Sequence, residues 1–212
     1  MSFIFGGIFA AAVIVHLSAV LLGRKKTECI SKIFLLPPLL AAYITGSHTM
    51  LVTVILAAAA GWAGDVFLLG VNKPLFFRLG LASFLLGHLF YIPSMLRFTG
   101  GVSAPLAAVS AAVFSAAGAA VYRWIRPPGG MRIPVVFYEI TIMLMSMTAL
   151  QLFLSEKSPA SAAVFAGSLL FLASDCMLAR FLFNVRPKWG DFAVMASYIA
   201  AQTAIVSGLA VL

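Results

Sequence analysis

Two aspartates stand in matching local sequence that is otherwise apolar. Asp65 lies in Ala63-Gly64-Asp65-Val66-Phe67-Leu68, and Asp175 follows 110 residues later in Ala173-Ser174-Asp175-Cys176-Met177-Leu178. Each carboxyl group follows a small residue within a run long enough to cross a membrane. An ionisable side chain at membrane depth is costly and typically marks a polar cavity or a functional site. The two motifs therefore predict two halves of one site.

Paired carboxyl groups in apolar surroundings support acid–base chemistry. Two close carboxylates titrate separately, so one can carry a proton while the other stays charged. Such a pair can protonate a weak base and stabilise an oxocarbenium ion, as in glycoside hydrolysis, and it can equally form a proton relay. The chain contains no His-Glu-x-x-His, Cys-x-x-Cys, Gly-x-Ser-x-Gly or phosphate-binding glycine loop. These absences disfavour a zincin, a serine lipase and a nucleotide-driven pump, and leave a hydrolase and a transporter open.

The composition indicates an integral membrane protein. Of the 212 residues, 63% are hydrophobic and 9% are charged, whereas soluble domains have about 25% charged residues. Repeated apolar runs of about 20 residues predict an all-α polytopic membrane bundle that occupies residues 1–212 as a single domain. Cys29 lies in a basic loop and Cys176 in a span, so we expect neither a disulfide nor a metal site. Eight spans are predicted at about 3–22, 33–46, 49–70, 75–96, 104–124, 133–154, 160–182 and 190–211.

The basic residues predict the orientation of these spans. Twelve of the 14 Lys and Arg residues fall in the connections after spans one, three, five and seven, and only Arg97 and Lys157 fall on the other side. Positive-inside bias places the basic connections in the cytoplasm and both termini on the non-cytoplasmic side. This asymmetry and anionic headgroups explain the net charge of +8, so no nucleic-acid partner is expected. Short basic connections favour a bacterial inner membrane.

An internal repeat is suggested by the spacing of the motifs. The Asp65 motif lies on the third span and the Asp175 motif on the seventh, and the spans that follow them carry Leu81-Ala82-Ser83-Phe84 and Met195-Ala196-Ser197-Tyr198. A 4+4 parallel repeat would have halves of about 1–100 and 101–212, related by an axis along the membrane normal. It would bring the two aspartates face to face. Chance similarity in Ala-, Leu- and Ser-rich sequence is the alternative.

Further polar residues are predicted to share the cytoplasmic half of the bundle with the aspartates. They are Glu139, His88, Tyr91, Tyr138, Tyr198 and Gln202, with Lys32, Arg78 and Arg180 nearer the rim. Each has an ordinary structural explanation. Cations at the rim can extend to headgroups, His16 and His88 can bridge helices, and the tyrosines can pack at the interface. The glycines of this region, Gly61, Gly64, Gly80 and Gly87, predict close helix packing.

Several of these motifs together resemble one known family. Gly64-Asp65-x-x-Leu68, Gly87-His88-x-x-Tyr91, Ser174-Asp175 and Tyr198-x-x-x-Gln202 follow one another in order, and Lys32 opens the predicted second span. On these motifs the chain resembles the lysoplasmalogenases, the YhhN-like membrane proteins, over all eight spans. The resemblance implies hydrolysis of the vinyl ether bond of a lysophospholipid, lysoplasmalogen, which releases a fatty aldehyde and glycerophosphoethanolamine or glycerophosphocholine. The hydrolysis that this resemblance implies requires no metal or organic cofactor.

The chemistry of a vinyl ether suggests roles for these residues. One aspartate would be the general acid, and we favour Asp175 because it lies deeper; Asp65 would stabilise the cation and orient water. A third carboxylate, Glu139, is a further catalytic candidate. The expected substrate-binding or positioning residues are Lys32, Arg78, His88, Tyr91, Tyr138, Arg180, Tyr198 and Gln202. The alternatives are a proton-coupled carrier of a small lipid or metabolite and a non-catalytic lipid-binding protein; an external half almost bare of polar groups counts against a carrier.

Overall fold

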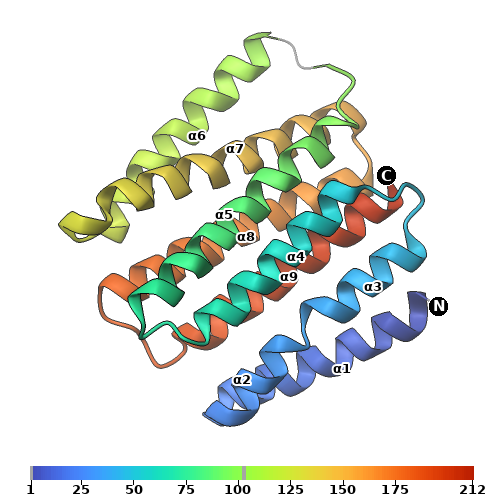
Figure 1. Ribbon diagram of the computed structural model, residues 1–212. Coiled ribbons are helices and arrows are strands. Elements are labelled where there is room, and N and C mark those ends of the chain that lie inside the picture. The colour runs from blue at the N-terminus through green and yellow to red at the C-terminus, as the bar shows by residue number, and fades with distance from the viewer. Residues whose placement is uncertain (1, 102–103) are drawn as a thin grey trace. The chain divides into compact units, whose positions relative to one another are not determined.

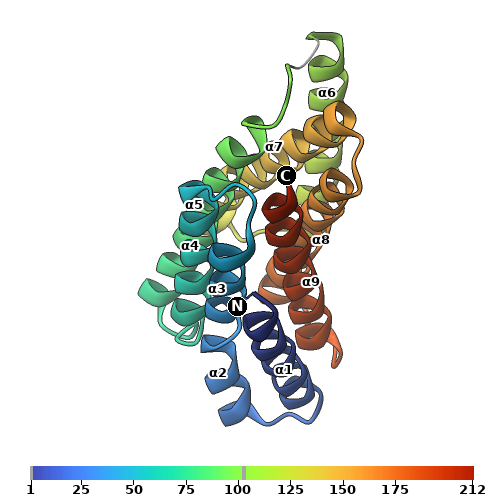
Figure 2. The same ribbon diagram turned by 90° about the vertical axis from the view of Figure 1, so that its right-hand side faces the viewer.

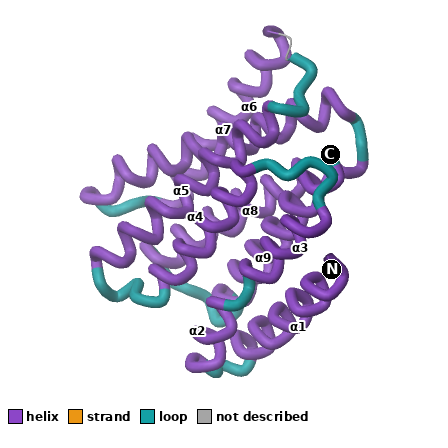
Figure 3. Tube along the Cα trace, turned by 45° about the vertical axis from the view of Figure 1, so that its right-hand side comes forward, coloured by secondary structure: helices purple, strands orange, loops and turns teal. Residues whose placement is uncertain are grey.

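The protein folds into α-helices joined by short connections. The computed structural model describes residues 2–101 and 104–212, and no strand occurs within these ranges (Figure 3). The helices are α1 (Ser2–Leu21), α2 (Lys25–Ile33), α3 (Leu36–Gly46), α4 (Val52–Leu68), α5 (Pro74–Leu96), α6 (Ala104–Ile125), the short 3-10 turn η1 (Gly129–Met131), α7 (Arg132–Glu156), α8 (Pro159–Phe183) and α9 (Gly190–Val211).

The predicted all-helical membrane bundle is confirmed, since each of the eight predicted spans corresponds to a helix. Seven helical segments of the described chain are long and apolar enough to cross a membrane, and α4 is a shorter apolar helix of 17 residues. Helices suit this solvent because a membrane offers the backbone no hydrogen-bond partners other than its own groups. The orientation of the termini and the internal repeat stay predictions.

The second span differs from its predicted bounds of 33–46. A helix already begins at Lys25, and a break at Phe34 and Leu35 separates α2 from α3. Pro37 and Pro38 in the first turn of α3 cause this break, because proline cannot donate a backbone N–H and its ring clashes with the preceding turn. Lys32 therefore does not open a span, as the sequence suggested, but lies in the last turn of α2.

The chain forms two compact units. Unit 1 is Met1–Ser94 with Leu209–Leu212, and unit 2 is Met95–Gly208. In unit 1, α1 packs against α2 and α3, and both α2 and α3 pack against α4 (Figures 1 and 2). The backbone N–H of His48 donates to the carbonyl of Ala210 at 2.8 Å, which ties the last residues of the chain to this unit.

Glycines bring α4 and α5 into close contact, as the sequence predicted. A Cβ atom at Gly64 would lie 2.7 Å from the ring of Phe84, and one at Gly80 would lie 2.8 Å from the side chain of Leu68. A Cβ atom at Gly87 would lie 3.2 Å from the carbonyl oxygen of Ala57. Small residues let helix backbones approach in this way inside membranes. The packing fixes the position of α4, which carries Asp65.

Unit 2 is built around the pair α7 and α8, which α6 covers on one side. Ser158 and Ser161 form a capping box at the start of α8, and Pro159 occupies its first turn. At the opposite end of α8, Arg180 donates to the carbonyl of Trp124 at 2.7 Å and Asn184 to that of Ile125 at 2.8 Å. These bonds satisfy the last carbonyls of α6, which have no partner within their own helix.

Candidate functional site

Asp65 is held by an ion pair inside unit 1. Its Oδ1 lies 3.3 Å from Nζ of Lys32, and the side chains are 2% and 16% exposed, respectively. The helix break after Ile33 allows this contact, because it ends α2 while the Lys32 side chain faces α4. A carboxylate in an apolar environment stays ionised when a cation lies this close. The pair therefore supplies a charged carboxylate with its own counter-ion.

A second contact from α4 reaches the same helix break. The indole N–H of Trp62 donates to the carbonyl oxygen of Ile33 at 2.9 Å. In an unbroken helix this carbonyl would accept from residue 37, but Pro37 has no N–H to donate. Trp62 and Asp65 are three residues apart on α4 and thus share one face. That face holds both the freed carbonyl of Ile33 and the ammonium of the preceding Lys32.

Asp175 is held by a different partner inside unit 2. The hydroxyl of Tyr138 on α7 donates to Oδ2 of Asp175 on α8 at 2.5 Å. The preceding Ser174 donates to the carbonyl of Val194 on α9 at 2.9 Å, which fixes this turn of α8. Tyr138 was a candidate for substrate contact or packing; the structure shows that it bonds to Asp175, and its contact with substrate stays a prediction. These partners of the two aspartates thus differ in kind: a phenol hydroxyl for Asp175 and an ammonium for Asp65.

Glu139, which follows Tyr138, faces a groove between α6 and α7. The groove has a volume of about 560 Å³, and its walls include Phe114, Gly118 and Tyr122 of α6 together with Met143 of α7. Glu139 is 9% exposed. Its Oε1 lies 3.6 Å from the position that a Cβ atom at Gly118 would take, and it has no hydrogen-bond partner among the described residues. A buried carboxyl oxygen of this kind lies ready to accept a hydrogen bond.

The remaining candidates occupy different positions. His88 and Tyr91 are buried on α5 in unit 1, and Gln202 is buried on α9 in unit 2. Tyr198 is also buried on α9, and its ring meets that of Phe171 edge to face at 5.5 Å. The residues predicted to bind phosphate differ from one another. Arg78 is exposed on α5, Arg180 lies over the Trp124 ring at 5.6 Å and caps α6, and Lys32 is engaged by Asp65.

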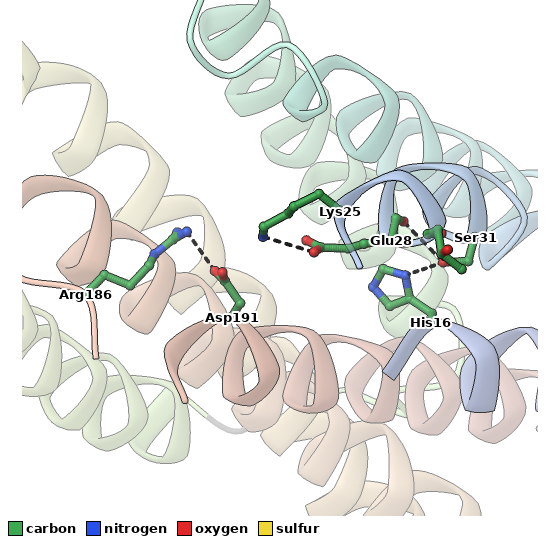
Figure 4. A network of polar contacts seen from close by, with 7 residues as sticks. His16, Lys25, Glu28, Ser31, Arg186 and Asp191 are labelled. Atoms are coloured by element: carbon green, nitrogen blue, oxygen red, sulfur yellow. Dashed lines mark hydrogen bonds and ion pairs between the residues drawn. The ribbon is translucent and has the colours of Figure 1, made fainter. Parts of the chain in front are cut away.

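Other polar contacts lie near the ends of the helices. In unit 1, Nδ1 of His16 lies 2.9 Å from Oγ of Ser31, and Lys25 pairs with Glu28 at 3.0 Å (Figure 4). Since Ser31 donates to the carbonyl of Thr27 at 2.7 Å, His16 is the donor to Ser31. In unit 2, Arg186 pairs with Asp191 at 2.7 Å. The described residues include no group of three His, Cys, Asp or Glu side chains that could hold a metal ion.

The structure brings together pairs that the sequence left separate. The sequence indicated a role for each of Lys32, Asp65, Tyr138 and Asp175 but not the pairing of Lys32 with Asp65 or of Tyr138 with Asp175. The contact from Trp62 had one sequence signal, because a proline four residues after a carbonyl leaves that carbonyl in need of another donor. The meeting of Asp65 and Asp175 in one site stays a prediction.

One comparison with known proteins gives a match. The profile of the YhhN family matches residues 27–209, a range that contains both aspartate motifs and both of their partners. No curated protein and no solved structure matches the chain.

Proposed function

The chain belongs to the YhhN family, the family of lysoplasmalogenases, and from this premise we propose that it hydrolyses the vinyl ether bond of lysoplasmalogen. The products would be a fatty aldehyde and glycerophosphoethanolamine or glycerophosphocholine. The family match over residues 27–209 is the observation that carries the proposal. The two differently partnered aspartates support it, because the reaction needs one protonated and one charged carboxyl group.

The reaction begins with transfer of a proton to the β-carbon of the vinyl ether. We assign this proton to Asp175, whose carboxyl group is held in place by the hydrogen bond that it accepts from the Tyr138 hydroxyl at 2.5 Å. Protonation creates an oxocarbenium ion on the carbon next to the ether oxygen. Asp65, kept ionised by Lys32 at 3.3 Å, would stabilise this cation.

Water completes the reaction. It adds to the oxocarbenium carbon and gives up a proton to a carboxylate, which acts as a general base. The resulting hemiacetal loses its hydroxyl proton and breaks its bond to the glycerol oxygen, which takes up a proton in exchange, so that the fatty aldehyde and the glycerol hydroxyl compound leave. The acid is then restored, and no electrons are gained or lost. Four buried side chains, His88, Tyr91, Tyr198 and Gln202, are proposed to orient the carboxyl groups or the water.

The test is aldehyde release from vinyl-ether lysophosphatidylethanolamine by the purified protein. Asp65→Asn and Asp175→Asn should each lower turnover by about 10²–10⁴-fold, the usual contribution of a general acid or base. Asp191→Asn is the matched control, since Asp191 pairs with Arg186 near the surface, where an ion pair contributes little. Absence of turnover by the parent protein with either headgroup would overturn the proposal.

A further inference from the structure

The groove between α6 and α7 is formed by one stripe of each helix. The lining residues of α6 follow one another at alternating intervals of three residues and one residue, so they lie on a single face of the helix. They are Ala111, Phe114, Ser115, Gly118, Ala119, Tyr122 and Arg123. The α7 side repeats this spacing from Val136 to Met147. A volume of about 560 Å³ lies within the range of about 300–1,000 Å³ that is usual for small-molecule sites.

The length of the groove fits one hydrocarbon chain. Ala111 and Arg123 are twelve residues apart on α6, which corresponds to about 18 Å along the helix axis. One leaflet of a bilayer has a hydrocarbon thickness of about 15 Å, half of the usual core. Between Ala111 and Gly118 the α6 wall of the groove is almost entirely apolar, and the α7 wall contributes Met143 and Met147. A single aliphatic chain can therefore lie along it at full length.

The other end of the groove is polar. Oε1 of Glu139 lies at the level of Gly118, buried and without a hydrogen-bond partner among the described residues. Arg123 follows Gly118 by five residues on α6, about 7.5 Å farther along the axis. Arg123 is exposed, and its guanidinium is a strong ligand for a phosphate group. The groove thus offers an apolar channel, then a hydrogen-bond acceptor, then a cation.

We propose that this groove binds a single-chain glycerophospholipid, with Glu139 accepting a hydrogen bond from the free glycerol hydroxyl and Arg123 binding the phosphate. The three parts of such a lipid follow the same order as the three parts of the groove. A two-chain phospholipid has no hydroxyl at this glycerol carbon, so Glu139 would distinguish the two classes. The proposal rests on the proposed function for its choice of lipid, and it makes Glu139 a specificity-determining residue.

Binding can be tested without turnover by using a saturated alkyl lysophosphatidylethanolamine, which has no vinyl ether to cleave. The parent protein in detergent should bind this lipid about tenfold or more tightly than its 2-O-methyl analogue, because the analogue leaves the Glu139 oxygen without a donor. Glu139→Leu should abolish this difference, whereas Glu139→Gln, which keeps an acceptor oxygen, should retain part of it.

The apolar end of the groove has a matched pair of variants. Ala111→Phe places a ring at the far end of the groove, and Ala120→Phe places the same ring on the opposite, exposed face of α6. Ala111→Phe should weaken binding of long-chain lipids more than of short-chain lipids, and Ala120→Phe should leave the chain-length profile of the parent unchanged.

Equal binding of the two analogues by the parent, or equal chain-length profiles for the two phenylalanine variants, would overturn the proposal. Binding with the expected pattern but without hydrolysis of the vinyl ether lipid would instead overturn the proposed function and leave the groove assignment in place.

Discussion

The ammonium of Lys32 determines how Asp65 can act. The two groups are 3.3 Å apart and largely buried, and removal of one partner of a buried pair typically costs about 3–5 kcal/mol. We therefore predict that Lys32→Met lowers the free energy of unfolding by roughly this amount, and that Lys32→Met with Asp65→Leu recovers much of it while remaining inactive. Denaturant titration in mixed micelles and aldehyde release would measure the two effects. Additive single and double variants would show that the pair is not coupled.

The hydroxyl of Tyr138 matters for the reaction more than for the fold. Its bond to Asp175 at 2.5 Å positions the proposed acid, and a typical hydrogen bond contributes about 0.5–1.5 kcal/mol. Tyr138→Phe should therefore lower kcat by about twofold to tenfold, with little change in KM.

Tyr43→Phe is the control for this change. Tyr43 donates to the carbonyl of Thr49 and accepts from the N–H of Leu51 in unit 1, so its loss should reduce stability and leave kcat unaltered. A Tyr138→Phe enzyme with the kcat of the parent would remove Tyr138 from the mechanism.

At the scale of elements, Trp62 compensates for the proline that divides α2 from α3. Its indole N–H donates to the Ile33 carbonyl, which receives no hydrogen bond from Pro37 because proline has no backbone N–H. Trp62→Phe should lower the free energy of unfolding by about 0.5–1.5 kcal/mol, the usual net contribution of one hydrogen bond. In a Pro37→Ala background the new N–H can take over this carbonyl, so Trp62→Phe should then cost clearly less.

A double-mutant cycle measures this coupling, and Trp189→Phe, which changes an exposed indole, is the control. Equal costs of Trp62→Phe in both backgrounds would mean that the hydrogen bond does not replace the missing proline donor.

The close approach of α4 and α5 depends on Gly64. A Cβ atom there would lie 2.7 Å from the Phe84 ring, whereas one at Gly7 on α1 would have no neighbour within 4 Å. Gly64→Ala should destabilise the protein by about 1–3 kcal/mol through overpacking, and it should also reduce turnover because Asp65 is the next residue. Gly7→Ala should leave both properties near those of the parent. Thermal unfolding would measure the stability of both variants, and aldehyde release from the same samples would measure their turnover. Equal melting temperatures for the two variants would contradict the packing argument.

At the scale of the whole molecule, the sequence predicts what depends on local composition. Apart from the second span, where α2 and the break before α3 were not predicted, apolar runs predicted the helices to within a few residues. The small residues at 64, 80 and 87 indicated where α4 and α5 meet. The partners of the two aspartates could not be predicted in the same way. Which polar group faces Asp175 depends on the rotation of α7 relative to α8, and the position of Lys32 depends on a helix break that directs its side chain towards α4. The groove beside Glu139 likewise requires two helix faces in register.

The orientation of the chain in the membrane can be tested with one native side chain. Cys29 is exposed on α2 and lies among basic residues that the positive-inside rule assigns to the cytoplasm. In a Cys176→Ser background and in sealed right-side-out vesicles, a membrane-impermeant maleimide should label Cys29 only after the vesicles are opened. Glu156→Cys, in a Cys29→Ser version of that background, should label before opening, because residue 156 lies at the other end of α7 from Arg132. The reverse pattern would place Arg123 and the polar end of the α6–α7 groove at the outer face, and single-chain lipids would then have to enter from the outer leaflet.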